Sequence, residues 1–373
     1  MKRTKSKHFG PPFSQLKYCS RCCLPETAEG IKFDDMGICQ VCRSSEQKIH
    51  INWIEREKQL KKILEKYKNQ ACNNYDCILP ISGGKDSFFQ AHILVKVYGL
   101  KPLAVTFSHN WYSPVGKQNL DNLLEKFNLD HIMFTPNRAL VNKLARKSLA
   151  MIGDACWHCH AGVGAFPLQI AIKFNIPLIV WGESTAELTG RATYEDIQLI
   201  KFTRDYFIRQ SAKYWPEQMV DKNISAKDIF PFNFPSQVKF DRAGVVGIHL
   251  GDYIFWDLER QVEFIKNEYG WLEDNVEGTY KKYKSVECVM PGVHDYTKYL
   301  KRGFGRATDH ASQDVRAGLM TRKEAFDSIK KIEPEEPKIL DYYLKISGYT
   351  KKEFYDIMKK KRIGKAKSLK LHE

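Results

Sequence analysis

Ser82-Gly83-Gly84-Lys85-Asp86-Ser87 follows a short apolar run, residues 77–81, and opens a segment of helical pattern, residues 86–98. A glycine-rich turn between a strand and a helix directs backbone N–H groups and the positive end of the helix dipole toward one point. Lys85 adds a full positive charge there, and the serines add hydroxyl donors. The stretch therefore predicts a phosphate-binding loop, with Asp86 either capping the helix or holding a metal ion on the phosphates.

The order of residues in this loop differs from that of the common P-loop, which has four residues between its first glycine and a Gly-Lys pair. It resembles the PP-loop of ATP pyrophosphatases, enzymes that cleave ATP between the α and β phosphates. The resemblance implies that the loop binds the pyrophosphate portion of ATP and that AMP is transferred to a carbonyl-type oxygen. Lys85 and Asp86 are the catalytic residues that it implies.

Apolar runs alternate with helical patterns after the loop. The apolar runs cover residues 77–81, 103–107, 131–134 and 178–181, and the helical patterns cover residues 86–98, 116–127, 140–151 and 163–174. Strands that are apolar on both faces and alternate with helices are typical of parallel sheets. The predicted fold class is α/β, a doubly wound parallel sheet of the Rossmann-like PP-loop ATPase type, with an N-terminal zinc ribbon and a helical C-terminal extension.

Two further strand ends support a nucleotide site, because ligands of open parallel sheets bind beyond the carboxyl ends of the strands. Gly182 permits a ligand to approach the backbone closely. Glu183 either accepts a hydrogen bond from a ribose, holds a metal ion or is a charge at the N-terminus of a helix. We expect ATP with Mg²⁺ at this edge. The predicted ATP-binding residues are Ser82, Gly83, Gly84, Lys85, Asp86, Ser87, Thr106, Gly182 and Glu183.

The chain has ten cysteines and shows no export signal, so we do not expect a disulfide framework. We expect these cysteines to be metal ligands, core residues or reactive thiols. Cys19-x-x-Cys22 and Cys39-x-x-Cys42 are separated by 16 residues, a spacing typical of Cys₄ zinc ribbons. Four thiolates on two tight turns can close a tetrahedron and hold together a segment too small for its own core. The sequence predicts structural zinc on Cys19, Cys22, Cys39 and Cys42.

A second cysteine cluster, Cys156-Trp157-His158-Cys159-His160, lies just before a helical pattern. Its thiols and imidazoles are potential ligands for a second zinc ion or an iron–sulfur cluster, with a third thiol from Cys288. PP-loop tRNA thiolases carry an iron–sulfur cluster on such a pair and a distant cysteine. The alternative is a cysteine pair without metal, with His158 or His160 lining the substrate pocket, and the sequence leaves both open.

The net charge of +15 is concentrated at the ends of the chain: residues 1–17 and 351–373 carry eleven of these charges. We therefore expect solvated tails or a mobile basic helix and no nucleic-acid partner. The apolar runs are too short to span a bilayer, so the prediction is a cytoplasmic protein that is not integral to a membrane. The predicted domains are a basic tail (1–17), a zinc-ribbon module (18–50), a PP-loop ATP-pyrophosphatase domain (51–300) and a helical basic region (301–373).

The last 75 residues have helical patterns and two capping-box motifs, Thr321 with Glu324 and Thr350 with Glu353. We expect a packed helical subdomain here rather than a DNA-reading helix-turn-helix.

Several motifs together give a resemblance that covers nearly the whole chain. They are residues 18–22, 30–34, the loop at 82–87, residues 175–183, and residues 294–299 with 303–310. The chain resembles the N-acetyl sugar amidotransferases of bacterial surface-polysaccharide synthesis, the WbpG and PseA type, and the string at residues 156–160 resembles the WbpG branch more closely.

The resemblance implies an ATP-dependent conversion of the acetamido group of a nucleotide-activated sugar to an acetamidino group, in O-antigen or lipopolysaccharide biosynthesis. AMP transfer to the amide oxygen creates a leaving group that ammonia displaces. We expect Lys298, Arg302 and Arg306 to bind the sugar diphosphate. Since the chain has no cysteine in a glutaminase setting, ammonia comes from solution or from a partner. The family uses a glutaminase subunit like that of histidine biosynthesis, with a cyclase-like companion, and we expect the same here.

Two alternatives remain. A PP-loop tRNA thiolase would share the ATP chemistry, the zinc module and the cysteine pair, but the segment at residues 294–310 favours the sugar enzyme. A non-catalytic zinc- and nucleotide-binding scaffold would have no need of both Lys85 and Asp86.

Overall fold

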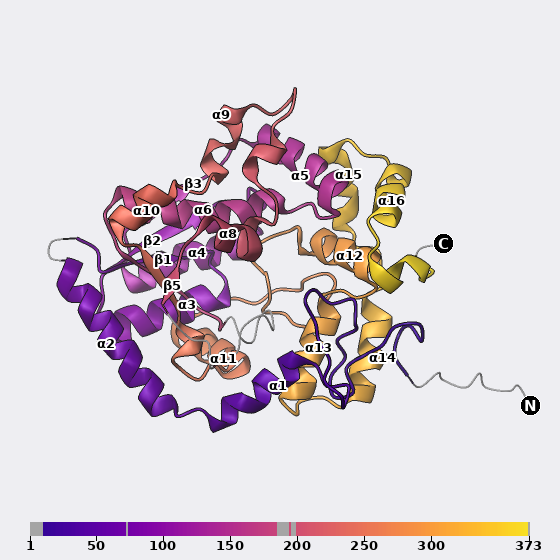
Figure 1. Ribbon diagram of the computed structural model, residues 1–373, viewed down its shortest axis with the longest axis horizontal. Coiled ribbons are helices and arrows are strands. Elements are labelled where there is room, and N and C mark those ends of the chain that lie inside the picture. The colour runs from indigo at the N-terminus through magenta and orange to yellow at the C-terminus, as the bar shows by residue number, and fades with distance from the viewer. Residues whose placement is uncertain (1–9, 72–73, 185–193, 195–198, 372–373) are drawn as a thin grey trace, which may run out of the picture.

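The computed structural model describes residues 10–71, 74–184, 194 and 199–371. A six-stranded sheet in the order β3-β2-β1-β4-β6-β5 forms its centre, with the C-terminal helices to one side (Figure 1). All neighbouring strands are parallel except β5 and β6, which are antiparallel. The strands are β1 Cys77–Pro80, β2 Pro102–Phe107, β3 His131–Phe134, β4 Leu178–Trp181, β5 Ile200–Lys201 and β6 Val246–His249.

The strand order reverses between β1 and β4. The chain first builds outward from β1 through β2 to β3 and then returns to place β4 beside β1. The loops that leave β1 and β4 therefore diverge and open a crevice at the carboxyl ends of these strands. The phosphate loop follows β1, and Glu183 follows β4, so the topology brings these predicted site residues to one place.

Helices cover both faces of the sheet, which confirms a doubly wound arrangement. Cys77 and Leu79 of β1 face one buried cluster, while Ile78 between them faces the other. The first face is covered by α2 (Trp53–Ala71), α3 (Lys85–Ala91), α4 (Pro114–Phe127) and α11 (Leu258–Tyr269). The second face is covered by α5 (Arg138–Ile152), α6 (Trp157–Lys173) and α10 (Gln237–Ala243).

The four predicted strands and the helices between them are confirmed, with two differences. Helix α6 begins at Trp157 rather than near residue 163, so the second cysteine cluster forms its first turn instead of preceding it. Strand β6 was not predicted, because Gly247 interrupts its apolar pattern. A Cβ atom at this glycine would meet the ring of Phe202 at 2.5 Å, so the strand needs a glycine to pack against that ring.

Five helices form the C-terminal region: α12 (Pro291–Arg302), α13 (Arg306–Arg316), α14 (Arg322–Ile332), α15 (Ile339–Ser347) and α16 (Lys351–Lys360). Both predicted capping boxes are present, at the starts of α14 and α16. A domain boundary after residue 300 would cut α12. No helix among the described residues combines the length and the apolar character needed to cross a membrane.

The basic C-terminal segment is packed, in contrast to the expected solvated tail. Phe354 and Met358 of α16 are buried in the same cluster as Tyr343 of α15. The buried guanidinium of Arg362 donates to the carbonyls of Leu369 and Leu371, which fixes the final turn. The basic residues expose their charges while the apolar positions between them hold the segment in place.

The N-terminal basic tail is only partly described. Residues 1–9 lie outside the described part of the chain, but Leu16 is buried in the cluster of α12, α15 and α16. Phe13 packs beside Tyr299 with ring centroids 6.4 Å apart. The last residues of the predicted tail therefore belong to the folded core.

Candidate functional site

The phosphate loop is held open by its glycines at the crevice between β1 and β4. Gly83 has a φ of +84°, and a Cβ atom there would lie 2.8 Å from the backbone nitrogen of Leu120 and 2.9 Å from the carbonyl oxygen of Gly116. Any side chain would therefore strain the turn and collide with α4. The Ser87 hydroxyl accepts from the N–H of Ser82 at 3.0 Å and closes the loop.

Lys85 is buried in the loop and is held by two carboxylates. Its ammonium group lies 2.6 Å from Oδ1 of Asp86 and 3.2 Å from Oε1 of Glu183. Burial alone would lower the pKa of Lys85, but the two carboxylates outweigh it and raise this pKa above its ordinary value. A charged ammonium is thus available for an anion, as the sequence predicted.

A second lysine, which the sequence analysis missed, lies beside the first. The ammonium of Lys284 is 3.1 Å from Oε1 of Glu183. Burial lowers the pKa of Lys284. Burial alone would raise the pKa of Glu183, but the two lysines outweigh it and hold this pKa below its usual range. Lys284 comes from the connection between α11 and α12, a stretch without periodic pattern, so no sequence signal marked it.

Glu287 is another charged group that the sequence analysis missed. Its Oε2 would lie 3.3 Å from a Cβ atom at Gly84 of the loop, and its backbone would collide with a side chain at Gly116. Burial raises the pKa of the Glu287 carboxyl above its ordinary value. Asp86, Glu183 and Glu287 carry carboxylate oxygens of the kind that Mg²⁺ takes together with substrate phosphates, but their oxygens do not all lie within 4.8 Å of one another.

The segment that carries Lys284 and Glu287 is fastened to the loop. The indole N–H of Trp271 donates to the carbonyl of Gly83 at 3.1 Å. The N–H of Ser113 donates to the carbonyl of Glu287 at 3.1 Å, and the Ser113 hydroxyl donates to that of Val286. The phosphate loop and residues 271–288 therefore form one packed unit, although they are nearly 200 residues apart in sequence.

Two other predicted ATP-binding residues are placed at the strand ends. The Thr106 hydroxyl donates to the carbonyl of Ile81 at 2.9 Å and pairs with His131 at 2.8 Å, so it ties two strand ends together. A Cβ atom at Gly182 would lie 3.0 Å from the side-chain nitrogen of Gln90. Gly182 thus allows close packing behind Glu183 rather than offering a side chain to a ligand.

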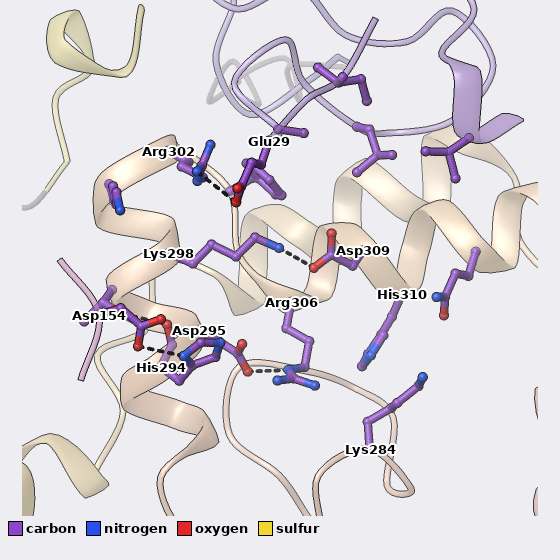
Figure 2. A pocket seen from close by; sticks show the side chains of 18 of the residues that line it. Glu29, Asp154, Lys284, His294, Asp295, Lys298, Arg302, Arg306, Asp309 and His310 are labelled. Carbon is purple, nitrogen blue, oxygen red and sulfur yellow. Dashed lines mark hydrogen bonds and ion pairs between the residues drawn. The ribbon is translucent and has the colours of Figure 1, made fainter. Parts of the chain in front are cut away.

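A cavity of about 450 Å³ lies beside the loop. Figure 2 shows residues of α12, of α13 and of the N-terminal module facing each other across it, with Lys284 at its edge. Lys284 therefore contacts Glu183 at the loop and also lines the cavity. The charged residues of the lining are Glu29, Asp154, Lys213, Lys284, Asp295, Lys298, Lys301, Arg302, Arg306, Asp309 and Arg316.

The predicted substrate arginines line this cavity and are held by protein partners. Arg306 donates to Asp295 and, through Nη1, to Ser285 at 3.1 Å. Arg302 donates to the carbonyl of Thr27 at 2.9 Å. Both guanidinium groups are thus fixed in position at the wall, where an anion can meet them without their having to be ordered first.

The structure places the two histidines that were predicted for the pocket in different surroundings. His160 lines the cavity, whereas His158 is fully buried and lies with Nε2 3.2 Å from the carbonyl of His109. The ring of His158 packs edge-on against Trp111, with centroids 4.7 Å apart. Since His158 points into the core from the first turn of α6, the structure does not place it on the substrate pocket.

The four N-terminal cysteines form a buried cluster of thiols. Sγ of Cys19 lies 3.9 Å from that of Cys42, and Sγ of Cys22 lies 3.7 Å from that of Cys39. The N–H groups of Arg21, Cys22 and Cys39 point at Sγ of Cys19. Sulfurs at these separations, supported by N–H donors, suit a tetrahedral metal ion, so the cluster can hold a metal such as zinc.

The module around these cysteines, residues 18–50, packs on the C-terminal helices. The Arg322 guanidinium at the start of α14 donates to the carbonyls of Cys22 at 2.9 Å and Cys19 at 2.8 Å. Phe304 is buried among the four cysteines. In Figure 1 the indigo N-terminal segment accordingly lies against α13 and α14. The module thereby supplies one wall of the cavity.

The second cysteine cluster is arranged differently from the prediction. Cys156, Cys159 and Cys288, all among the described residues, do not form a set whose sulfurs all lie within 4.8 Å of one another. Cys288 instead forms a backbone bridge with Tyr112, and burial raises the pKa of the Cys159 thiol to about 12. Cys156 groups with Asp154 and His294, neither of which was predicted as a ligand.

Comparison with known proteins adds two findings. Residues 277–367 match the family model described as "LPS biosynthesis protein WbpG-like, C-terminal domain". An uncharacterized protein of Methanocaldococcus jannaschii is 23% identical over 323 residues, which cover 86% of this chain and 95% of that protein. The family match begins just before Lys284 and Glu287 and includes α12 to α16, so it contains much of the cavity wall.

Proposed function

We propose, from the WbpG-like C-terminal domain that residues 277–367 form, that the protein is an ATP-dependent amidotransferase of lipopolysaccharide biosynthesis. It converts the acetamido group of a nucleotide-activated sugar to an acetamidino group. The observation that carries the proposal is the position of Lys284, which contacts Glu183 at the phosphate loop and also lines the charged cavity. Two adjacent anion sites suit transfer of AMP from ATP to a second substrate.

The first step is adenylation of the sugar's amide. The amide oxygen attacks the α phosphorus of ATP, the bond to the bridging oxygen breaks, and pyrophosphate leaves. The N–H groups of the loop and the ammonium groups of Lys85 and Lys284 stabilise the negative charge that develops on the pyrophosphate. Mg²⁺ bound to the phosphates would neutralise part of their charge, with Asp86 or Glu183 supplying a carboxylate ligand.

The second step replaces oxygen with nitrogen. Ammonia attacks the carbon of the adenylated imidate, AMP leaves with the former amide oxygen, and a proton is released to solvent. The cavity holds the sugar nucleotide through Arg302 and Arg306, whose positions are fixed by Thr27 and Asp295.

Ammonia reaches the site from a partner glutaminase, with a cyclase-like subunit as its companion. This part of the proposal rests on the resemblance of the chain to sugar amidotransferases. The Cys₄ module acts structurally, because it builds one wall of the cavity and its thiols are buried. The tRNA thiolase and the non-catalytic scaffold are alternatives that the following experiment distinguishes.

The test supplies the purified full chain with ATP, Mg²⁺, ammonium and a UDP-acetamido sugar. We expect AMP, pyrophosphate and a sugar lighter by the difference between an oxygen atom and an imino group. The variant Lys85→Ala should abolish AMP formation, and Lys282→Ala, which changes an exposed lysine nearby, should not. AMP formed only with tRNA and a sulfur donor indicates a thiolase, and no AMP under either condition indicates a scaffold.

A further inference from the structure

Three side chains of different chemistry meet beside the cavity, and two of them, Asp154 and His294, line it. A carboxylate oxygen of Asp154, the sulfur of Cys156 and a ring nitrogen of His294 all lie within 4.8 Å of one another. Asp154 and Cys156 belong to the turn between α5 and α6, and His294 belongs to α12. The fold thus brings together ligand types that occur together in transition-metal sites.

The three groups hold each other in place without a metal ion. Oδ1 of Asp154 accepts from the backbone N–H of Cys156 at 2.8 Å and lies 3.0 Å from Nδ1 of His294. Figure 2 shows Asp154 and His294 facing each other across the gap between two segments. The carboxylate and the imidazole are therefore oriented by contacts on two sides before any ligand arrives.

The cluster is open to the cavity on one side. The side chains of Asp154 and His294 are 24% and 25% exposed, and both line the cavity. His160, in the first turn of α6, adds a second imidazole, whose ring centroid lies 5.4 Å from that of His294. A site with three protein ligands and an accessible fourth position is the usual arrangement of a catalytic rather than a structural zinc ion.

We propose that Asp154, Cys156 and His294 bind a divalent transition-metal ion of the zinc class, with an open coordination position that faces the cavity. The ion replaces the thiol proton of Cys156 and the ring proton on the coordinating nitrogen of His294. This site is distinct from the buried Cys₄ cluster, and it uses Cys156 without Cys159 or Cys288. A metal ion here can take an oxygen ligand from a molecule in the cavity.

The role of this ion rests on the proposed function, whereas its binding does not. If the cavity holds an acetamido sugar, the open position can accept a hydroxyl oxygen of the sugar and orient its acetamido group for the reaction. Loss of the metal would then lower the rate of amidination and leave the nucleotide-binding loop intact. Measuring metal content and activity separately keeps the two claims distinguishable.

The test measures metal in the full-length protein after chelation and titration with Zn²⁺ alone. We expect two zinc ions per chain, one in the Cys₄ cluster and one in the new site. His294→Ala and Asp154→Ala should each lose one of the two, and Cys159→Ser and Cys288→Ser should retain both. A wild-type chain that binds only one zinc ion would overturn the proposal. The proposal would also be overturned if His294→Ala kept both zinc ions while Cys159→Ser lost one of them.

A second measurement covers the case in which a variant does not fold, as judged by circular dichroism and thermal melting. X-ray absorption of the zinc-loaded wild-type protein should show an average zinc environment with both sulfur and nitrogen or oxygen ligands. A spectrum with sulfur ligands alone would overturn the proposal. An inactive protein with two zinc ions in mixed ligand sets would contradict the proposed reaction and leave the metal site standing.

Discussion

The ammonium of Lys284 lies 3.1 Å from Oε1 of Glu183, the same oxygen that Lys85 approaches at 3.2 Å. One buried carboxylate therefore holds two lysines that are far apart in sequence at the edge of the sheet. Because opposite charges at this separation attract strongly in a buried setting, the shared carboxylate holds the two ammonium groups close together. A phosphate group that enters can take the place of the carboxylate between them.

Replacing Lys284 with alanine should lower the rate of AMP formation by about 10²-fold, as the loss of one electrostatic stabiliser does in other active sites. The reason is that one of the two ammonium groups facing the pyrophosphate is removed. Steady-state measurement of AMP release with varied ATP gives kcat and KM separately. The exposed Lys282→Ala serves as the matched control and should keep the wild-type rate. Equal rates for the two variants would contradict the assigned role.

Gly83→Ala should strongly lower the rate of ATP turnover, whereas Gly244→Ala should not. Both glycines have a positive φ, but a Cβ atom at Gly83 meets the backbone of α4 at 2.8 Å, whereas nothing lies within 4 Å of one at Gly244. The alanine at 83 forces the loop to shift, and a displacement of this kind can reduce a rate by about 10²-fold. The alanine at 244 costs only about 1 kcal/mol of backbone strain. Thermal melting and AMP release on both variants measure the difference.

Arg322→Lys should loosen the Cys₄ module from α14. The lysine keeps the charge but lacks the planar fork with which the guanidinium reaches both carbonyls, so the variant loses about 2 kcal/mol of docking free energy. We expect faster release of zinc to a colorimetric chelator, measured by absorbance, and a lower melting temperature. Lys331→Ala, an exposed change in the same helix, is the control. Identical release from the wild type and Arg322→Lys would show that the contact does not support the module.

Stability should fall as the pH rises through neutrality because of Glu333. Burial raises the pKa of this carboxyl from 4.5 to about 7, although the N–H of Thr308 donates to it at 2.7 Å. Between pH 4.5 and about pH 7 the native state holds a proton on Glu333 that the unfolded chain has lost. The protonated carboxyl therefore stabilises the native state at low pH, and this stabilisation is lost as the pH rises to about 7.

The variant Glu333→Gln tests this sign. Its free energy of unfolding should change less between pH 5 and pH 8 than that of the wild type, by up to about 3 kcal/mol. Urea unfolding at several pH values measures the effect. The exposed Glu335→Gln should follow the wild type. A wild-type stability that rises over this range relative to Glu333→Gln is the opposite of what burial predicts.

The sheet could be predicted because its signals are local. Residues 77–81, 103–107, 131–134 and 178–181 are short apolar runs between helical patterns, and each became a strand. The remaining strands β5 and β6 could not be predicted, because β5 has two residues and β6 contains Gly247. That glycine is explained only by the ring of Phe202, a contact that requires the folded chain.

The candidate site was predictable only where a motif stands in one stretch of sequence. The loop around Lys85 and the paired cysteines were identified from spacing alone. Lys284 and Glu287 were not identified as site residues, because they lie on a segment without a motif and gain their place through packing against distant parts of the chain. His294 lies in a motif of the family resemblance, but its contact with Asp154 and Cys156 appears only in the folded chain. His158 was predicted beside the pocket, but its side chain is buried in the core at the start of α6. The sequence does not show which way this first helical turn faces.

The contact between the Cys₄ module and α14 also has a consequence for the order of synthesis. Residues 19–42 leave the ribosome well before Phe304 and Arg322, which cover them. The thiols can take up their metal ion early, since all four lie close together in sequence. The apolar face of the module then stays uncovered until residues 304–322 have emerged. If translation stops before residue 304, the nascent chain holds its metal ion but exposes an apolar surface of the kind that chaperones bind.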